Sequence, residues 1–131
     1  MILLDTNICI YIINAKPATV LARFCQFRLG EIGLSSVVAA EIAHGVAKSG
    51  SERNRRALEM FLAPLEIVPF DEKAVWAYGE LRGDLERLGQ PIGSLDTMIA
   101  AHALSWNAVL VTNKTREFSR VKGLRLENWV E

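Results

Sequence analysis

Short runs of consecutive apolar residues alternate along the chain with longer stretches in which apolar residues recur every three or four positions. The short runs predict strands at 1–4, 32–35, 65–70, 108–111 and, more weakly, 124–127. Apolar runs without polar alternation are typical of strands that are buried on both faces, as in a parallel sheet. The pattern therefore predicts four or five short strands in one sheet.

The stretches between these runs have helical spacing. Helices are expected at 8–13, 18–27, 37–46, 52–62, 71–88 and 95–104, with a short turn or helix at Phe118. Ser36 and Asp71 are the predicted N-terminal caps of the third and fifth helices. Strands that alternate with helices indicate βαβ units. We expect a single α/β domain over residues 1–131, with a short parallel sheet flanked by helices.

Composition narrows the possible classes of protein. Half of the residues are hydrophobic and 23% are charged, with zero net charge, so the chain is globular but not globally basic. The N-terminus lacks a signal-peptide pattern and no apolar run is long enough for a membrane span, so we expect a cytoplasmic protein. Cys9 and Cys25 both lie in apolar helical patterns, which predicts buried free thiols.

The first strand ends on three oxygen-bearing side chains, Asp5, Thr6 and Asn7. In open parallel sheets, ligands bind at the carboxyl ends of the strands, where Asp5 is expected. An alternative is that Asp5 or Thr6 only caps the following helix. The choice depends on whether other acids reach the same edge of the sheet.

Three further acids are candidates for that edge. Glu41 lies among small apolar residues, Asp96 stands in the opening turn of a nearly apolar helix, and Glu117 follows the strand 108–111. Each also has an ordinary explanation: exposure of Glu41 to solvent, a favourable helix dipole at Asp96, or pairing of Glu117 with a nearby arginine.

Several carboxylates at one edge repel one another unless a cation neutralises them. Mg²⁺ and Mn²⁺ prefer such oxygen ligands, and they can activate water and stabilise charge on a phosphoryl oxygen. The sequence has no zinc-binding pattern, P-loop or Ser/His/Asp set. Its two histidines, His44 and His102, are expected to be helix-packing or surface residues.

Several motifs along the whole chain together resemble PIN-domain ribonucleases, and more narrowly the VapC toxins of bacterial type II toxin–antitoxin pairs. In chain order these motifs are Leu4-Asp5-Thr6-Asn7, the segment 35–41 ending on Glu41, Pro91-Ile92-Gly93 with Asp96, Ile99-Ala100-Ala101-His102-Ala103, and Arg116-Glu117-Phe118 with Gly123-Leu124 and Glu127-Asn128-Trp129. The resemblance implies a three-layer α/β/α fold and a Mg²⁺- or Mn²⁺-dependent endoribonuclease that blocks translation. Similar toxins most often cut tRNA near the anticodon, with initiator tRNA prominent. The family also implies a homodimer, inhibition by a VapB-type antitoxin whose tail enters the acidic cleft, and operator DNA binding through the antitoxin complex.

The resemblance also carries residue roles onto this sequence. The expected catalytic acids are Asp5, Glu41, Asp96 and Glu117, of which Asp5, Glu41 and Asp96 would ligate the metal. Supporting positions are Thr6, Asn7, Thr112 and Asn113, and expected RNA contacts are Lys114, Arg116 and Arg120. Family members commonly have a fourth acid after the late strand, where this chain has Asn113 and Lys114. Glu117 is the best available substitute, and the number of metal ions stays open.

Charge distribution agrees with an RNA-binding segment, because residues 114–125 contain five basic residues and one acid. A second basic group, Arg53, Arg55 and Arg56, is equally well explained as a solvated helix face. Two other functions compete with the nuclease. One is a catalytically silent PIN-fold module that binds RNA or a partner, and the other is a phosphohydrolase with Asp5 as nucleophile. The second usually needs an acid two residues later, where this chain has Asn7.

Overall fold

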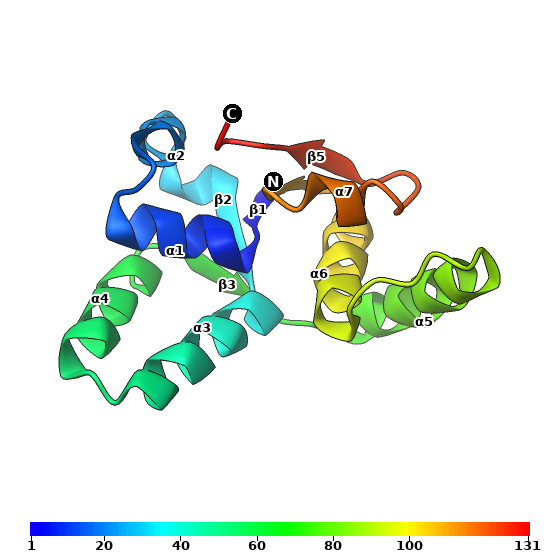
Figure 1. Ribbon diagram of the computed structural model, residues 1–131, viewed down its shortest axis with the longest axis horizontal. Helices are drawn as coiled ribbons and strands as arrows, with labels where there is room; N and C mark the ends of the chain where they lie inside the picture. Colours follow the sequence, from blue (N-terminus) through cyan, green and yellow to red (C-terminus); the bar gives the residue numbers. More distant parts are fainter.

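The computed structural model of the protein describes residues 1–131 and contains one five-stranded parallel sheet (Figure 1). The strands are β1 (Ile2–Leu4), β2 (Ile32–Ser35), β3 (Glu66–Val68), β4 (Val109–Val111) and β5 (Arg125–Glu127). Their order across the sheet is β3-β2-β1-β4-β5, and all four pairings are parallel. The predicted α/β class and the parallel sheet are confirmed.

Seven α-helices and one short 3₁₀-helix connect the strands. They are α1 (Thr6–Asn14), α2 (Ala18–Phe24), η1 (Leu29–Glu31), α3 (Ser36–Ser49), α4 (Glu52–Leu62), α5 (Glu72–Arg87), α6 (Ser94–Ser105) and α7 (Thr115–Phe118). Every expected helix is present. None of them is long and apolar enough to cross a membrane.

The strand order has a topological switch point between β1 and β4. The chain moves from β1 outward through β2 to β3, and then crosses back to β4 on the other side of β1. Because parallel crossovers are right-handed, the helices before and after this reversal cover opposite faces of the sheet. Figure 1 agrees, since α1 to α4 lie on one side of the molecule and α5 with α6 on the other. Ligands of such folds bind outside the carboxyl ends of the strands that flank the switch point.

The hydrophobic core joins the two helix layers through the sheet. Leu3, Leu34 and Leu110, one from each central strand, are at most 1% exposed. At the chain's end, the buried Trp129 stacks on Phe27, with ring centroids 5.5 Å apart. The short strands are therefore held by packing on both faces, as the apolar runs predicted.

A buried polar contact ties α6 to the start of α3. His102 on α6 is fully buried, and its Nδ1 lies 2.7 Å from the Ser35 hydroxyl. Ser35 also caps α3, because its Oγ accepts a hydrogen bond from the Val37 backbone N–H at 3.1 Å. Ser35 can therefore donate its own proton to Nδ1 of a neutral His102. Burial lowers the pKa of the imidazole, although the charge of Asp71 and the backbone of Pro69 act against this.

Two details differ from the sequence-based predictions. Ser35, not Ser36, caps α3, and the Ser36 hydroxyl instead accepts a hydrogen bond from the Phe70 N–H. Cys25 is exposed, because α2 ends at Phe24 and the chain turns there. Asp71 caps α5, as predicted.

The buried imidazole predicts a pH dependence of stability. With its pKa lowered in the fold, His102 stays neutral while the unfolded chain takes up a proton below about pH 6.5. The free energy of unfolding should therefore fall as pH falls through 6.5 towards the lower folded pKa. Urea melts of wild type and His102→Gln at pH 7.5 and 5.5 measure this, and the variant should lose less stability between the two values. His44→Gln is the matched control, because the only other histidine is exposed on α3. An equal loss in wild type and His102→Gln would contradict the prediction.

Candidate active site

Asp5 is the central acid of the site and is only 1% exposed. It directly follows β1, beside the switch point, and its backbone N–H donates a hydrogen bond to the Val111 carbonyl of β4 at 2.9 Å. Its Oδ1 accepts a hydrogen bond from the Thr6 N–H at 2.8 Å and so caps α1. Its Oδ2 accepts a hydrogen bond from the Thr112 hydroxyl at 2.7 Å. Asp5 is thus both a helix cap and part of a polar network, and both of its oxygens are oriented by hydrogen bonds.

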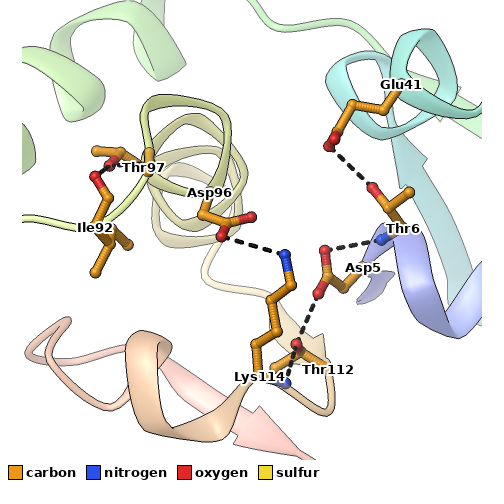
Figure 2. A network of polar contacts seen from close by, with 9 residues as sticks. Asp5, Thr6, Glu41, Ile92, Asp96, Thr97, Thr112 and Lys114 are labelled. Atoms are coloured by element: carbon orange, nitrogen blue, oxygen red, sulfur yellow. Dashed lines mark hydrogen bonds and ion pairs between the residues drawn. The ribbon is translucent and has the colours of Figure 1, made fainter. Parts of the chain in front are cut away.

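Glu41 reaches the site from α3, the helix that follows β2. Its Oε1 accepts a hydrogen bond from the Thr6 hydroxyl at 3.0 Å (Figure 2). Thr6 therefore links the first and second acids, with its backbone bound to Asp5 and its side chain bound to Glu41. Both Thr6 and Glu41 are half-buried, so Glu41 is not simply a solvent-exposed residue.

Asp96 reaches the same place from the first turn of α6 on the opposite side of the switch point. Its Oδ2 lies 3.4 Å from the Lys114 ammonium, in an ion pair whose acid is 19% exposed. The neighbouring Thr97 is buried and donates its hydroxyl hydrogen bond to the Gly93 carbonyl at 2.8 Å. This bond fixes the entry of the chain into α6 and hence the position of Asp96.

Thr112 connects the acids with the loop after β4. Its hydroxyl donates to Asp5 and accepts a hydrogen bond from the Lys114 backbone N–H at 3.0 Å. The side chain is fully buried, so both bonds are shielded from water. Figure 2 shows the resulting chain of contacts, which runs from Glu41 through Thr6, Asp5 and Thr112 to the loop that carries Lys114.

Burial and like charge set the electrostatics of the site. Burial raises the pKa of the Asp5 carboxyl above its ordinary value, and the negative charge of Asp96 adds to the rise. The hydrogen bonds from Thr112 and Thr6 and the charge of Lys114 oppose it. Burial acts to lower the pKa of Lys114, but Asp96, Asp5 and Glu41 together raise it above its ordinary value. The ammonium is therefore held charged by all three acids.

The surface is hollowed on two sides of Glu41. A groove of about 240 Å³ runs between α1, α3 and α4 and ends at Thr6 and Glu41. A second hollow of about 420 Å³ lies between α3 and α6 and also borders Glu41. Larger hollows lie elsewhere on the surface and contain none of the three acids. A partner can thus approach Glu41 from either side of α3.

The donor set suits a hard divalent cation. Asp5, Glu41 and Asp96 offer carboxylate oxygens, which are the ligands that Mg²⁺ and Mn²⁺ prefer. All three act on one ammonium, so they share a region of negative potential. No three acidic, histidine or cysteine side chains lie close enough together to hold one ion without rearrangement. Mg²⁺ commonly takes only one or two carboxylates and keeps several waters, so the residues fit the ion with water completing its shell.

The other predicted site residues are less closely connected. Asn7 and Glu117 are half-buried and make no side-chain hydrogen bond or ion pair, so the role of Glu117 as a fourth acid stays a prediction. Asn113 donates its Nδ2 hydrogen bond to the Tyr11 hydroxyl at 3.0 Å, which fixes the loop after β4 against α1. Arg116 is exposed and makes no ion pair, whereas Arg120 donates a hydrogen bond to the Pro91 carbonyl at 3.0 Å.

Sequence reasoning missed three partners of the site residues. The Lys114–Asp96 ion pair has a sequence signal, since one basic residue follows a strand at the edge where acids were expected. The Ser35–His102 contact has one as well, because His102 is the only polar residue in an apolar run. Tyr11 gives no such signal, since an aromatic residue on a helix is ordinarily a packing residue.

Comparison with known proteins identifies the family of the chain. The family model described as PIN domain matches residues 2–124. Ribonuclease VapC2 of Rickettsia felis is 46% identical over 97% of this chain and 96% of that protein. A tRNA(fMet)-specific endonuclease VapC of Shigella flexneri is 44% identical over the same shares.

Solved structures give the same result for the fold. VapBC2 from Rickettsia felis, bound to a DNA fragment from its promoter, matches with a TM-score of 0.90 at 46% identity, covering 98% of this chain and 99% of that one. DNA-bound VapBC from Salmonella typhimurium matches with a TM-score of 0.91 at 40% identity, covering 98% and 97%. The chain belongs to the PIN-domain family and, within it, to the VapC ribonucleases.

Proposed function

We propose that the protein is a metal-dependent endoribonuclease toxin of a VapBC pair. The observation that carries this proposal is that three acids from separate elements, Asp5, Glu41 and Asp96, belong to one polar network at the switch point. Thr6 joins Asp5 to Glu41, and the loop that Thr112 ties to Asp5 carries the ion-pair partner of Asp96. Acids gathered in this way repel one another and destabilise the fold unless a cation neutralises them. The names of its relatives support ribonuclease activity.

Each residue of the network has a separate task in this proposal. Asp5, Glu41 and Asp96 would hold Mg²⁺ or Mn²⁺, which when bound supplies an activated water and stabilises charge on the scissile phosphate. Thr112 and the α1 N-terminus hold Asp5 in its ionised orientation, because they donate hydrogen bonds to both of its oxygens. Thr6 orients Glu41. Thus the support comes from hydroxyl and backbone groups that do not change charge.

The RNA surface is proposed to be the loop after β4 and the helix α7. Lys114 and Arg116 lie there beside the acids, and Arg116 is exposed without an ion-pair partner. A phosphate backbone needs such free cations near the cleavage site. Arg120 follows α7, and its bond to the Pro91 carbonyl places its guanidinium beside the loop that leads to Asp96.

For the substrate, we propose tRNA cut in the anticodon loop, with initiator tRNA as the leading candidate. The Shigella flexneri relative that is 44% identical is named a tRNA(fMet)-specific endonuclease. A single-stranded loop suits a shallow, open acidic edge, because its bases can be splayed out and its phosphates reached. Cleavage of this tRNA would stop translation and growth.

The partner is proposed to be a VapB-type antitoxin that binds the groove between α1, α3 and α4. The groove is lined by apolar side chains together with four polar ones, among them the site residues Thr6 and Glu41. The apolar lining residues are Ile10, Ile13, Ile42, Val46, Ala57 and Leu58. A peptide with apolar anchors and one basic side chain would fill it and reach the acids. We further propose a homodimer. We also propose that the complex with the antitoxin binds operator DNA through the antitoxin, and the DNA in the VapBC structures of two relatives supports DNA binding by such a complex.

The nuclease proposal predicts the loss of RNA cleavage in an acid variant. Purified Asp96→Asn should lose at least about a hundredfold in Mg²⁺- or Mn²⁺-dependent cleavage of bacterial tRNA, because a metal ion contributes several kcal/mol of transition-state stabilisation. Gel analysis of tRNA fragments with and without EDTA measures this. Glu117→Gln in the same assay tests the fourth acid, and a comparable loss would support its proposed role. Asp84→Asn is the matched control, since Asp84 is an exposed acid paired with Arg87 on α5.

Cleavage that survives both EDTA and Asp96→Asn would contradict the metal site. Intact tRNA in every lane from folded, antitoxin-free protein would instead favour the silent binding module. That alternative is separable from the nuclease, because it predicts RNA binding without fragments.

The proposed RNA surface predicts a smaller salt dependence in an arginine variant. In an Asp96→Asn background, Arg116→Ala should weaken tRNA binding and reduce the slope of log K against log salt by about 0.7, the value for one single-strand phosphate contact. Fluorescence anisotropy at several salt concentrations measures this slope. Arg55→Ala is the control, because Arg55 is also exposed but is paired with Glu59 on α4. Equal slopes for Arg116→Ala and Arg55→Ala would remove Arg116 from the RNA surface.

A further inference from the structure

Lys114 places an ammonium among the three acids that are proposed to bind the metal. Its Nζ lies 3.4 Å from Asp96 Oδ2, and Asp5 and Glu41 also act on its charge. In Figure 2 the side chain extends from the loop after β4 towards Asp96 and passes beside Asp5. One cation of the chain itself thus stands in the region of negative potential where a divalent ion would be attracted.

The backbone of Lys114 is fixed, whereas its side chain is free to move. The backbone N–H donates a hydrogen bond to the Thr112 hydroxyl, which is itself bound to Asp5. The side chain is 42% exposed and its ammonium has one ion-pair partner, Asp96. The ammonium can therefore leave the acids by rotation about side-chain bonds, without any change in the sheet or in α7.

A divalent ion and the Lys114 ammonium cannot share this position at low cost. Positive charges a few ångströms apart repel strongly in a partly buried site. The repulsion is avoided if the ammonium moves outward, towards the open edge where α7 begins and where Arg116 is exposed. An RNA phosphate bound at that edge would then accept the displaced charge.

We propose that Lys114 is an internal competitor of the metal: it neutralises the acids in the metal-free protein and moves onto the RNA when the ion binds. This inference rests on the proposed metal-dependent function and names the residue that limits metal affinity. It also makes metal and RNA binding cooperative, since the ion releases a cation that the RNA can use. An acid-neutralising ammonium lets the metal-free protein keep three carboxylates together.

The test is the affinity of RNA-free protein for Mn²⁺, measured by isothermal titration calorimetry. Lys114→Met should bind Mn²⁺ about tenfold more tightly than wild type, because the ion no longer displaces a cation. Lys114→Arg keeps the charge and should stay close to wild type. Lys122→Met is the matched control: it removes the same charge from an exposed lysine that has no ion-pair partner, and its affinity should match wild type.

A second measurement uses the metal-free state. In EDTA, the melting temperature of Lys114→Met should fall below those of wild type and Lys122→Met, and Mn²⁺ should raise it by more than it raises either of them. If Lys114→Met does not fold, Lys114→Gln replaces it, since a polar side chain is tolerated at a partly exposed position.

The outcomes separate this inference from the function on which it rests. If wild type binds no Mn²⁺, the metal-dependent function fails. If wild type binds Mn²⁺ and Lys114→Met binds it equally or more weakly, the function stands and the competition is overturned. Tighter binding by both Lys114→Met and Lys122→Met would also overturn it, because the effect would then come from net charge alone.

Discussion

The burial of one carboxylate beside another acid at the switch point is the constraint on which the rest of the site depends. Asp5 is buried at the end of β1, and this burial, more than the charge of Asp96, raises the pKa of its carboxyl and disfavours its charged form. Its ionised form is nevertheless supported, since each of its two oxygens accepts a short hydrogen bond from a group that the fold fixes. The site is therefore built around an unfavourable charge rather than around a cavity.

The sheet topology explains why these acids meet although they are far apart in sequence. Asp5 follows β1 directly, and Thr112 follows β4, its neighbour across the switch point. Glu41 and Asp96 approach from helices that cover opposite faces of the sheet. A buried contact between His102 and Ser35 links these two helix layers, so the relative position of the two outer acids is fixed in the core. Packing behind the sheet edge thus controls geometry at the edge.

Much of this arrangement could be predicted from sequence, for identifiable reasons. The apolar runs predicted all five strands, because strands of a parallel sheet are buried on both faces. Asp5 and Asp96 were recognisable because each interrupts an apolar element with a charge. The cap of α3 was predicted one residue late, since Ser35 and Ser36 are equivalent by composition and only the backbone turn at Ser35 decides between them.

Contacts between distant segments could not be predicted from the sequence. The sequence places one basic residue, Lys114, at the edge where acids were expected. It does not select Asp96 as the partner, because the pairing depends on how the loop after β4 lies against α6. The bond between Tyr11 and Asn113 has the same origin, since it joins α1 to that loop across the switch point. Sequence patterns of this kind record burial and local backbone preference, whereas the partners of a polar side chain follow from tertiary packing.

Two kinds of donor stabilise the acids, neutral hydrogen-bond donors and a charged ammonium. They differ in whether they can move away from the acids. The Thr6 N–H and the Thr112 hydroxyl are anchored in a helix and at a strand end, so they hold Asp5 whatever else binds. The Lys114 ammonium stands on a flexible, partly exposed side chain and is removable. Fixed dipoles can orient a metal-binding carboxylate without competing with the metal, because they carry no net charge that would repel the ion. A movable charge can neutralise the metal-free state and then withdraw. The loop after β4 supplies both, with Thr112 for orientation and Lys114 for charge, only two residues apart.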